Sequence, residues 1–373
     1  MKAKRSFLVL ALSVVVSFSL AVPCMAWEKP KPEFVWKCQS SWPRGCGLHY
    51  LQMRTLDFIE NWTHGRVKFE RHSAGELVPG YETWKAVERG VIPTGLACTC
   101  YTMSRTWTSG MYCSAPGMGP VEKMAFYHGT PDVQDTKDYR TDVWKFLEKL
   151  EDKHFHVVTL PSAMQTTETF LYSQKPVNSI EDLKELKMRS VGVRGDVFKH
   201  AGCSVVGMPA GEVIPAMERG VIDACEFANF FGDLPLGFAD ACKYIYFNPY
   251  SSQPCDLMFF VNPKVWKKVP DDLKKQIKEA AFESMKWSLA ECLFLDFLAM
   301  RKAERVHKAK VALIPMEVGK YIHEQSMEFY AKKRKEDPDL DTYMKYHEEF
   351  FAPDNYGKYI KFIQALIASS TMY

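Results

Sequence analysis

One local pattern occurs twice in the chain, once in each half. Residues 74–79 read Ala-Gly-Glu-Leu-Val-Pro, and residues 210–215 read Ala-Gly-Glu-Val-Ile-Pro. Each copy is followed by a stretch compatible with a helix and then by Glu-Arg-Gly-Val-Ile, at 88–92 and 218–222. Proline is favoured in the first turn of a helix, and glycine ends helices because it adopts the left-handed conformation. Each copy therefore predicts a helix that ends at a glycine and leads into a short strand.

The predicted strands support two lobes of mixed structure. Two copies are too few for a solenoid but suit two α/β lobes, each with strands and helices around a mainly parallel sheet. The repeat predicts strands at 91–99 and 221–227, and runs of β-branched and aromatic residues predict others at 34–38, 67–71, 155–160 and 256–261.

The last third of the chain is predicted to be helical. Long amphipathic stretches cover residues 271–308 and 317–334. The first is longer than one lobe needs, so we expect it to brace both lobes or to pack against a second copy of the protein. The expected division begins with a leader at 1–26, followed by residues 27–160, which form mainly the first lobe, and residues 161–255, which form mainly the second. Residues 256–312 are expected to form a strand that returns to the first lobe and then the long helix. Residues 313–373 are expected to be helical and are a candidate dimerisation element.

The first 26 residues have the pattern of an export signal. Basic residues at positions 2, 4 and 5 precede an apolar run at 7–22, and small residues then lead to Ala26. The run is short for a helix that must cross about 30 Å of hydrocarbon. The alternatives are a transmembrane anchor and a lipid anchor on Cys24. We expect cleavage near Ala26 and a periplasmic location.

Charge and cysteine content narrow the possible partners. The full chain has a net charge of +3, and removing the leader takes away its three basic residues, so no net charge and no basic tract for nucleic acid remain. Of the eleven cysteines, Cys98 and Cys100 form a C-x-C pair, but no C-x-x-C occurs. In an oxidising compartment some cysteines can pair, whereas free buried cysteines are an equal alternative.

The sequence carries no motif of a common enzyme class, such as a nucleophile elbow, a P-loop or a His-Glu-x-x-His pair. Residues 192–195, Gly-Val-Arg-Gly, are only a fragment of a glycine-rich loop. Residues 191–194 are expected at the carboxyl end of a strand, where open α/β sheets bind ligands, and two charged residues lie beside this edge. Arg189 can hold a carboxylate with two hydrogen bonds, or it is an ordinary surface arginine. Glu226 follows an apolar strand, and a buried carboxylate is costly unless it is paired. It is an ion ligand, a partner of an arginine, or half of a structural salt bridge.

Three segments together resemble the substrate-binding subunits of TRAP (tripartite ATP-independent periplasmic) transporters. They are residues 74–79, the Leu-Lys-Glu-Leu-Lys-Met-Arg motif at 183–189, and Asp-Ala-Cys-Glu-Phe at 223–227. The resemblance implies a two-lobed α/β periplasmic solute-binding fold with a long connecting helix and a helical C-terminal extension. It also implies that Arg189 binds the carboxylate of a small organic acid, and that TRAP membrane subunits receive the ligand.

Within that family the chain resembles the branch that binds 2-oxo and 2-hydroxy monocarboxylates, such as pyruvate or lactate, together with a cation. The resemblance implies Gln165, Glu226 and the Phe227 carbonyl as cation and substrate ligands. The chain departs from the branch in having no glycines after Gln165 and a phenylalanine in place of tryptophan at 227. It also has Gln253-Pro where an acid-Pro pair is common. Gln253 is the fourth expected ligand, and Tyr101 is expected to offer a hydroxyl from the first lobe.

The implied ligand set consists of oxygens, which suit Na⁺ or Ca²⁺. A single acid among them favours Na⁺, and a site without a cation is the remaining alternative. Two rival functions are an exported enzyme with Glu226 as a base and a periplasmic ligand sensor. A base needs a pKa raised toward the working pH, and a nearby arginine or cation would lower the pKa of Glu226. We therefore predict a binding protein, not an enzyme, and expect a homodimer formed through the long helices.

Overall fold

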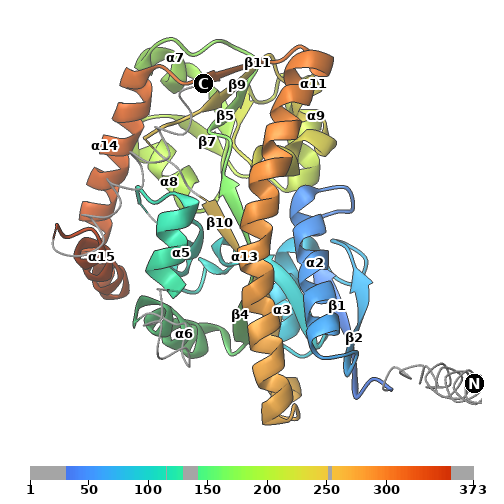
Figure 1. Cartoon of the computed structure of the whole chain (residues 1–373). Helices are drawn as coiled ribbons and strands as arrows, with labels where there is room; N and C mark the ends of the chain where they lie inside the picture. The colour runs from blue at the N-terminus through green and yellow to red at the C-terminus, as the bar shows by residue number, and fades with distance from the viewer. Residues whose placement is uncertain (1–30, 115, 129–141, 251–253, 354–373) are drawn as a thin grey trace, which may run out of the picture.

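The computed structural model describes residues 31–114, 116–128, 142–250 and 254–353, and its strands form two mixed sheets (Figure 1). The first sheet has the order β2 (Val67–His72), β1 (Phe34–Ser40), β3 (Thr94–Cys98), β10 (Pro254–Val261) and β4 (Val158–Thr167). The second has the order β11 (Lys310–Leu313), β9 (Tyr244–Phe247), β5 (Leu171–Ser173), β8 (Ala224–Cys225), β6 (Lys187–Arg189) and β7 (Ser204–Val206).

Helices cover both sheets and connect their strands. Those before β5 are α2 (Gly47–Trp62), α3 (Thr83–Glu88), α4 (Met111–Ser114), α5 (Pro120–His128) and α6 (Asp142–Phe155). Those of the second half are α7 (Ile180–Glu185), α8 (Gly192–His200), α9 (Ala210–Glu218), α10 (Phe230–Asp233), α11 (Phe238–Ala241), α12 (Pro263–Trp266), α13 (Asp271–Lys302), α14 (Met316–Lys333) and α15 (Pro338–Phe350). The short helices are η1 (Gly80–Glu82), η2 (Thr99–Thr102), η3 (Trp107–Gly110), η4 (Leu234–Leu236) and the π-helix η5 (Ala303–His307). In the described part of the chain, no helix combines the length and apolarity that a membrane span requires.

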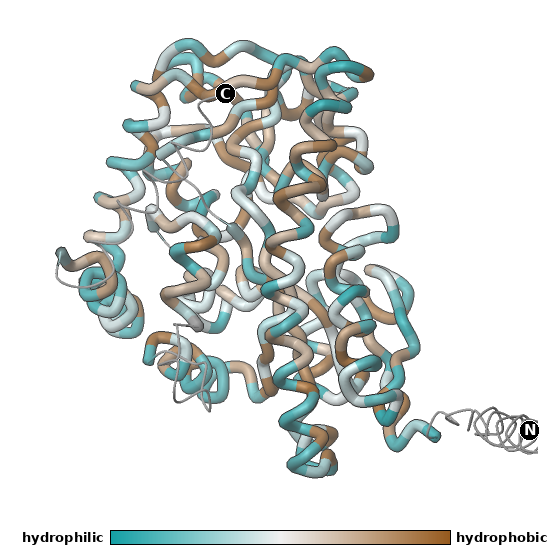
Figure 2. Tube along the Cα trace, in the orientation of Figure 1, coloured by the Kyte–Doolittle hydropathy of each residue, from teal (hydrophilic) through white to brown (hydrophobic). Residues whose placement is uncertain are grey.

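The chain passes between the two sheets at strands β4 and β10. β4 belongs to the first sheet and is followed after three residues by β5 in the second sheet. β10 follows β9 of the second sheet and returns to the centre of the first, antiparallel to both β3 and β4. Every residue of β10 is buried, as expected for a strand covered on both faces. By contrast, Figure 2 shows hydrophilic and hydrophobic residues mixed along the long helix α13, which lies outside the sheets.

Helix α13 is bonded to both halves of the molecule. Its 32 residues correspond to about 48 Å at 1.5 Å per residue, and it runs along both sheets (Figure 1). The backbone N–H of Met164 in β4 donates to Ser288 Oγ over 2.8 Å. Two turns further on, Asp296 accepts from the backbone N–H of Phe231 in α10 over 2.6 Å. The long helix therefore braces both lobes, which is one of the two roles expected for it.

The repeated sequence pattern folds in two different ways before it converges. Gly75 has φ +86°, so residues 74–79 form a turn, whereas residues 210–215 lie inside α9. Pro215 is the sixth residue of that helix, so the prediction of a proline in the first turn is wrong for this copy. Both helices nevertheless end at a left-handed glycine as predicted, Gly90 at φ +75° and Gly220 at φ +67°.

Several predicted strands have different bounds in the structure. The strand predicted at 155–160 begins only at Val158, because Phe155 is the last residue of α6 and His156 turns the chain with φ 48°. The strands predicted at 91–99 and 221–227 shorten to Thr94–Cys98 and Ala224–Cys225. The helix predicted at 271–308 is α13 followed by the π-helix η5.

Candidate functional site

The candidate site begins where two parallel strands of the second sheet end. β6 and β8 are hydrogen-bonded neighbours, with Arg189 opposite Cys225. The register continues one residue beyond β8, because the N–H of Glu226 donates to the carbonyl of Arg189 over 3.1 Å. Parallel strands end at the same edge of a sheet, and this edge is where α/β proteins bind ligands. The sequence residues that looked most unusual, Arg189 and Glu226, are thereby side by side.

Arg189 is 3% exposed, and its guanidinium is held by backbone carbonyls. It donates to the carbonyl of Glu226 over 2.9 Å and to the carbonyl of Met208 over 3.2 Å. Its Nη1 lies 3.7 Å from the Glu226 carboxylate, and its guanidinium carbon lies 5.2 Å from the centre of the Phe227 ring. Burial opposes the positive charge, but Glu226 raises the pKa of Arg189 above its ordinary value. Arg189 is thus a fixed, permanently charged group.

Glu226 is 4% exposed and is held at the start of a helix. Its Oε1 accepts hydrogen bonds from the Ser190 hydroxyl over 2.9 Å and from the backbone N–H of Val191 over 3.2 Å. Val191 is the residue that precedes α8, and the start of a helix favours a negative charge. Its other carboxylate oxygen lies 3.6 Å from Nη1 of Arg194, on the first turn of that helix. Glu226 therefore faces two arginines.

Gln165, near the end of β4, brings the first sheet to the same place. It is 1% exposed, and its amide oxygen accepts from the backbone N–H of Asn229 over 3.3 Å. Its amide nitrogen donates to Glu168 over 2.7 Å. The other carboxylate oxygen of Glu168 lies 3.3 Å from Arg194. Gln165 and Glu226 are thus linked through Glu168 and Arg194.

Burial changes the acidity of Glu168. Its side chain is 14% exposed, and the loss of solvation together with the neighbouring Glu226 charge raises its pKa to about 8, although Arg194 opposes the rise. Glu168 therefore holds a proton at neutral pH unless a cation takes the proton's place.

One small cavity connects the predicted site residues. It measures about 60 Å³ and is lined by Gln165, Arg189, Glu226, Phe227 and Tyr101 together with Glu168, Arg194 and residues of the first sheet. A cavity needs about 10–15 Å³ of such space to hold one water, so it has room for a ligand of a few non-hydrogen atoms. Gln253, the remaining predicted ligand, lies outside the described residues.

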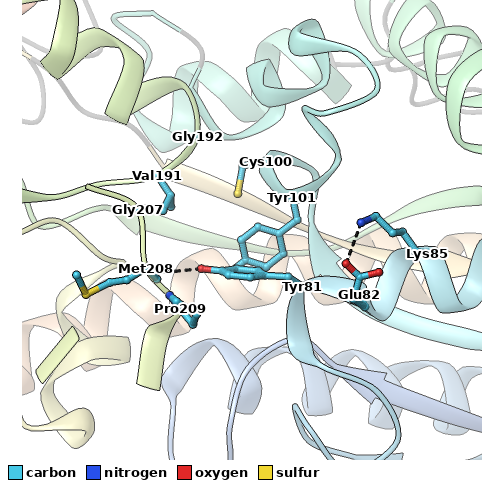
Figure 3. Close-up of a pocket in the computed structure, with 10 residues that line it drawn as sticks. All are labelled: Tyr81, Glu82, Lys85, Cys100, Tyr101, Val191, Gly192, Gly207, Met208 and Pro209. Atoms are coloured by element: carbon cyan, nitrogen blue, oxygen red, sulfur yellow. Dashed lines mark hydrogen bonds and ion pairs between the residues drawn. The ribbon is translucent and has the colours of Figure 1, made fainter. Parts of the chain in front are cut away.

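A larger pocket of about 360 Å³ adjoins this cavity and shares Cys100, Tyr101, Val191 and Gly192 with it. Figure 3 shows Tyr81 and Tyr101 projecting into the pocket opposite Gly207, Met208 and Pro209. The two rings meet edge to face at 4.5 Å, and the Tyr81 hydroxyl donates to the Met208 carbonyl over 3.4 Å. Residues of both lobes thus meet at the mouth of the cavity.

The structure adds two residues that the sequence reasoning did not select. Glu168 lies in the short link between β4 and β5, three residues after Gln165. Arg194 lies in the segment that looked like a fragment of a glycine-rich loop, although in the structure it is the first turn of α8. The strand end predicted at 191–194 could have selected Arg194, but no sequence signal selected Glu168, because its partner lies in a separate segment of the chain.

The donor set has the chemistry of a hard cation site. Gln165 and Glu226 offer an amide and a carboxylate oxygen to the cavity, and Glu168 adds a second carboxylate. Oxygen ligands of this kind suit Na⁺ and Ca²⁺. Arg189 and Arg194 balance the two acids, so a bound cation needs an anionic ligand beside it to keep the site neutral. The site thus fits a cation together with a small organic anion.

Comparison with known proteins decides the family. Residues 55–332 match the family model described as "Bacterial extracellular solute-binding protein, family 7" (DctP). The chain belongs to this family. The resemblance to TRAP solute-binding subunits is therefore confirmed, and the chain is an extracytoplasmic solute-binding protein, not an enzyme.

The relatives of this family 7 protein support the same class. It is 28% identical over 255 residues to a monocarboxylate 2-oxoacid-binding periplasmic protein of Nostoc sp.. The match covers 68% of this chain and 66% of the Nostoc protein, which is just under two thirds of its length. A TRAP solute-binding protein of Pseudoalteromonas atlantica, solved with sodium and pyruvate, has a TM-score of 0.79 at 21% identity over 91% of this chain and 99% of that one.

A third relative has the same fold and a different bound acid. A TRAP solute-binding protein of Bordetella bronchiseptica, solved as a dimer with calcium and picolinate, has a TM-score of 0.76 at 22% identity over 91% of this chain and 100% of that one. These structures confirm the predicted two-lobed α/β fold of the family 7 protein.

Proposed function

We propose that this protein captures a small 2-oxo or 2-hydroxy monocarboxylate between its two lobes, together with Na⁺ or Ca²⁺, and delivers it to TRAP membrane subunits. The observation that carries the proposal is the shared cavity, in which a buried arginine, two acids and an amide oxygen converge. The relatives that bind 2-oxo acids or carry pyruvate support the choice of ligand class.

Arg189 supplies the charge that selects an anion. Its guanidinium is buried and oriented by two backbone carbonyls, so little side-chain freedom is lost when a ligand binds. A carboxylate that approaches it exchanges a solvated charge for a charge-assisted hydrogen bond in a water-poor site. Arg194, beside Glu168 and Glu226, keeps those two acids from repelling the ligand.

The cation would be held by Gln165, Glu226, the Phe227 carbonyl and Gln253, with Glu168 as an additional acid. A 2-oxo or 2-hydroxy acid can complete the coordination with one carboxylate oxygen and the neighbouring oxygen. The second acid alters the expectation from the sequence, where a single acid favoured Na⁺. Two carboxylates raise the negative charge of the ligand set, and Ca²⁺ then competes with Na⁺ on favourable terms.

The test is a thermal-shift screen of the mature chain against 2-oxo acids, 2-hydroxy acids and dicarboxylates, each with Na⁺, with Ca²⁺ and after chelation. A ligand that binds only the folded state raises the melting temperature by mass action. We expect the largest shifts with pyruvate or lactate and a cation. Equal shifts with dicarboxylates, or none with any monocarboxylate at millimolar concentration, would contradict the proposal.

The protein is proposed to be a homodimer that associates through α13. One side of this helix carries a row of apolar side chains, Leu293, Phe294, Phe297 and Leu298, which are between 43% and 62% exposed. Such a row on a soluble protein marks an association surface. The Bordetella structure, solved as a dimer, supports a dimeric state but says nothing of the surface that forms it. Light scattering should give twice the chain mass, and Phe294→Asp with Phe297→Asp should give the single mass.

Export by a cleaved signal at residues 1–26 remains part of the proposal. These residues lie outside the described structure. Mass spectrometry of the protein recovered from the periplasm should give a chain that begins at Trp27. A chain of full mass in the membrane fraction would instead support the anchored alternatives.

A further inference from the structure

Four cysteines from three separate segments meet beside the ligand cavity. Cys98 ends β3, Cys100 lies in η2, Cys113 lies in α4, and Cys255 is the second residue of β10. Three of the four are buried and Cys100 is half-buried. The proposed carboxylate and cation site uses none of these thiols.

The four sulfur atoms lie in one group, in which Cys98, Cys100 and Cys113 are within 4.8 Å of one another and Cys255 contacts Cys98 and Cys113. Cys98 Sγ lies 2.7 Å from Cys100 Sγ, 2.8 Å from Cys113 Sγ and 3.3 Å from Cys255 Sγ. Cys113 Sγ also lies 2.8 Å from Cys255 Sγ. A disulfide would use one neighbour of each sulfur and leave the others crowded against it. A central ion uses all four sulfurs at once.

We propose that Cys98, Cys100, Cys113 and Cys255 bind one thiophilic metal ion, with Zn²⁺ as the expected occupant. Four thiolates are the ligand set of a structural zinc site, and soft sulfur ligands select Zn²⁺ or Cu⁺ over hard cations. This site is distinct from the proposed oxygen-ligand site, whose donors suit Na⁺ or Ca²⁺. Each thiol that binds the ion releases its proton to solvent.

The dimensions of the cluster allow the ion with a small adjustment. A Zn–S bond of about 2.3 Å places tetrahedral sulfurs roughly 3.8 Å apart. The sulfur pairs that now lie 2.7–3.3 Å apart would therefore separate, and Cys255 would move closer to Cys100. All four cysteines line the cavity of about 60 Å³, which provides space for that movement and a path for the ion.

The surroundings of the cluster favour the thiolate at Cys113. The backbone N–H of Cys100 donates to Cys98 Sγ over 3.2 Å, a contact that strengthens when the sulfur is charged. The buried ammonium of Lys123 contacts the two residues that flank Cys255 in the chain. It donates to the Pro254 carbonyl over 2.6 Å and lies 3.3 Å from the Asp256 carboxylate. Burial raises the pKa of the Cys113 thiol, but the neighbouring thiols and Lys123 together hold it well below its ordinary value. Burial and the neighbouring sulfurs raise the pKa of the Cys98, Cys100 and Cys255 thiols well above the ordinary value, so an ion must displace their protons.

A bound ion would fix the first-lobe wall of the ligand cavity. Cys98, Cys100 and Cys113 lie on both sides of Tyr101, which projects into the mouth shown in Figure 3. The segment 98–113 joins β3 to α4 through two short 3-10 helices, which have few backbone hydrogen bonds of their own. Joining this segment to Cys255 of the central strand would hold it in place.

The experiment uses the mature chain, reduced and handled without oxygen, and titrates it with Zn²⁺ and with Co²⁺ as a spectroscopic probe. We expect one ion per chain, intense thiolate-to-cobalt charge-transfer absorption, and a higher melting temperature with Zn²⁺. Cys98→Ser with Cys113→Ser should lower the affinity for Zn²⁺ by more than about 100-fold, since even loss of an outer partner costs 10–100-fold.

The matched control is Cys203→Ser with Cys242→Ser, which removes two buried cysteines from the core of the second lobe. It should keep one Zn²⁺ per chain and the cobalt spectrum. Circular dichroism of the metal-free forms separates loss of the site from loss of the fold. The proposal is overturned if the reduced wild-type chain binds no ion, or if the folded Cys98→Ser/Cys113→Ser variant binds it as tightly as the control. It is also overturned if mass spectrometry of protein isolated without oxygen finds these four thiols joined as disulfides.

Discussion

The two walls of the cavity differ in chemistry although both come from similar α/β lobes. The second lobe contributes charge, with Arg189 and Glu226 at the ends of β6 and β8 and Arg194 on the first turn of α8. The first lobe contributes aromatic and sulfur groups, with Tyr101 and the four-cysteine cluster at the end of β3 and the start of β10. The difference indicates that anion selection belongs to one wall, and shape with rigidity to the other.

The largest expected effect removes the charge from the second wall. Arg189→Ala should weaken carboxylate binding by about 100-fold or more, because truncating one partner of a buried charged pair costs 2–5 kcal/mol. Calorimetric titration of the ligand identified in the screen measures the change. Arg219→Ala, at an exposed position of the same lobe, is the matched control and should bind within about twofold of the wild type. If folded Arg189→Ala keeps its affinity for the carboxylate, another group selects the anion.

A smaller effect on cation affinity is expected from Glu168, which lies between the two walls of the cavity. Because the pKa of Glu168 is raised to about 8, a cation that binds beside it must displace a proton at neutral pH. The affinity for Ca²⁺ should therefore rise as the pH increases from 6 to 8, by up to about tenfold per unit. Titrations at several pH values should show a flat profile for Glu168→Gln. An unchanged slope in this variant would exclude Glu168 from the cation site.

The raised pKa of Glu168 also predicts how the stability of the cation-free protein depends on pH. Between the ordinary pKa of 4.5 and about 8, Glu168 is protonated when folded and ionised when unfolded, so the unfolded state binds fewer protons. The free energy of unfolding should fall as the pH rises through this window. Glu168→Gln should reduce that fall in urea unfolding experiments, and Ca²⁺ with ligand should also reduce it for the wild type. The pKa of Glu151 is likewise raised to about 8, so Glu151 also lowers the free energy of unfolding as the pH rises. Neither Glu168→Gln nor the bound Ca²⁺ should affect this contribution.

The smallest expected effect tests the first wall. Tyr101→Phe removes one hydroxyl and should weaken ligand binding by about 1 kcal/mol, or roughly fivefold. Tyr321→Phe is the control, because that hydroxyl donates to the Ala201 carbonyl in the second lobe over 2.8 Å. A loss as large as that of Arg189→Ala would show that the two walls share anion selection.

The sequence predicted the parts of the site that depend on strand ends. Arg189 is the last residue of β6 and Glu226 follows β8, and parallel pairing of those strands brought them together. The link between Glu168 and Arg194 was not predictable, because it joins the crossing segment to a helix start that looked like a loop. The cysteine cluster could not be predicted from the sequence for the same reason. Cys255 is 142 residues from Cys113, and no local spacing reveals such a group.

The fold was predicted where local chemistry decides the conformation and mispredicted where packing decides it. Gly90 and Gly220 end their helices in both copies of the repeat, because the left-handed conformation suits glycine whatever surrounds it. The preceding hexapeptide folds as a turn in one copy and a helix in the other. The same residue types are compatible with both, and the contacts of each lobe select one.

The attachment of α13 to both lobes restricts how the protein can release what it holds. Asp296 is bonded to the start of α10 and Ser288 to β4, so the lobes are joined along this side. An opening that keeps these bonds must separate the lobes elsewhere, and the contact of Tyr81 with Met208 between them is a long hydrogen bond of 3.4 Å. Loss of that contact would uncover the mouth of the cavity while α13 still joins the lobes.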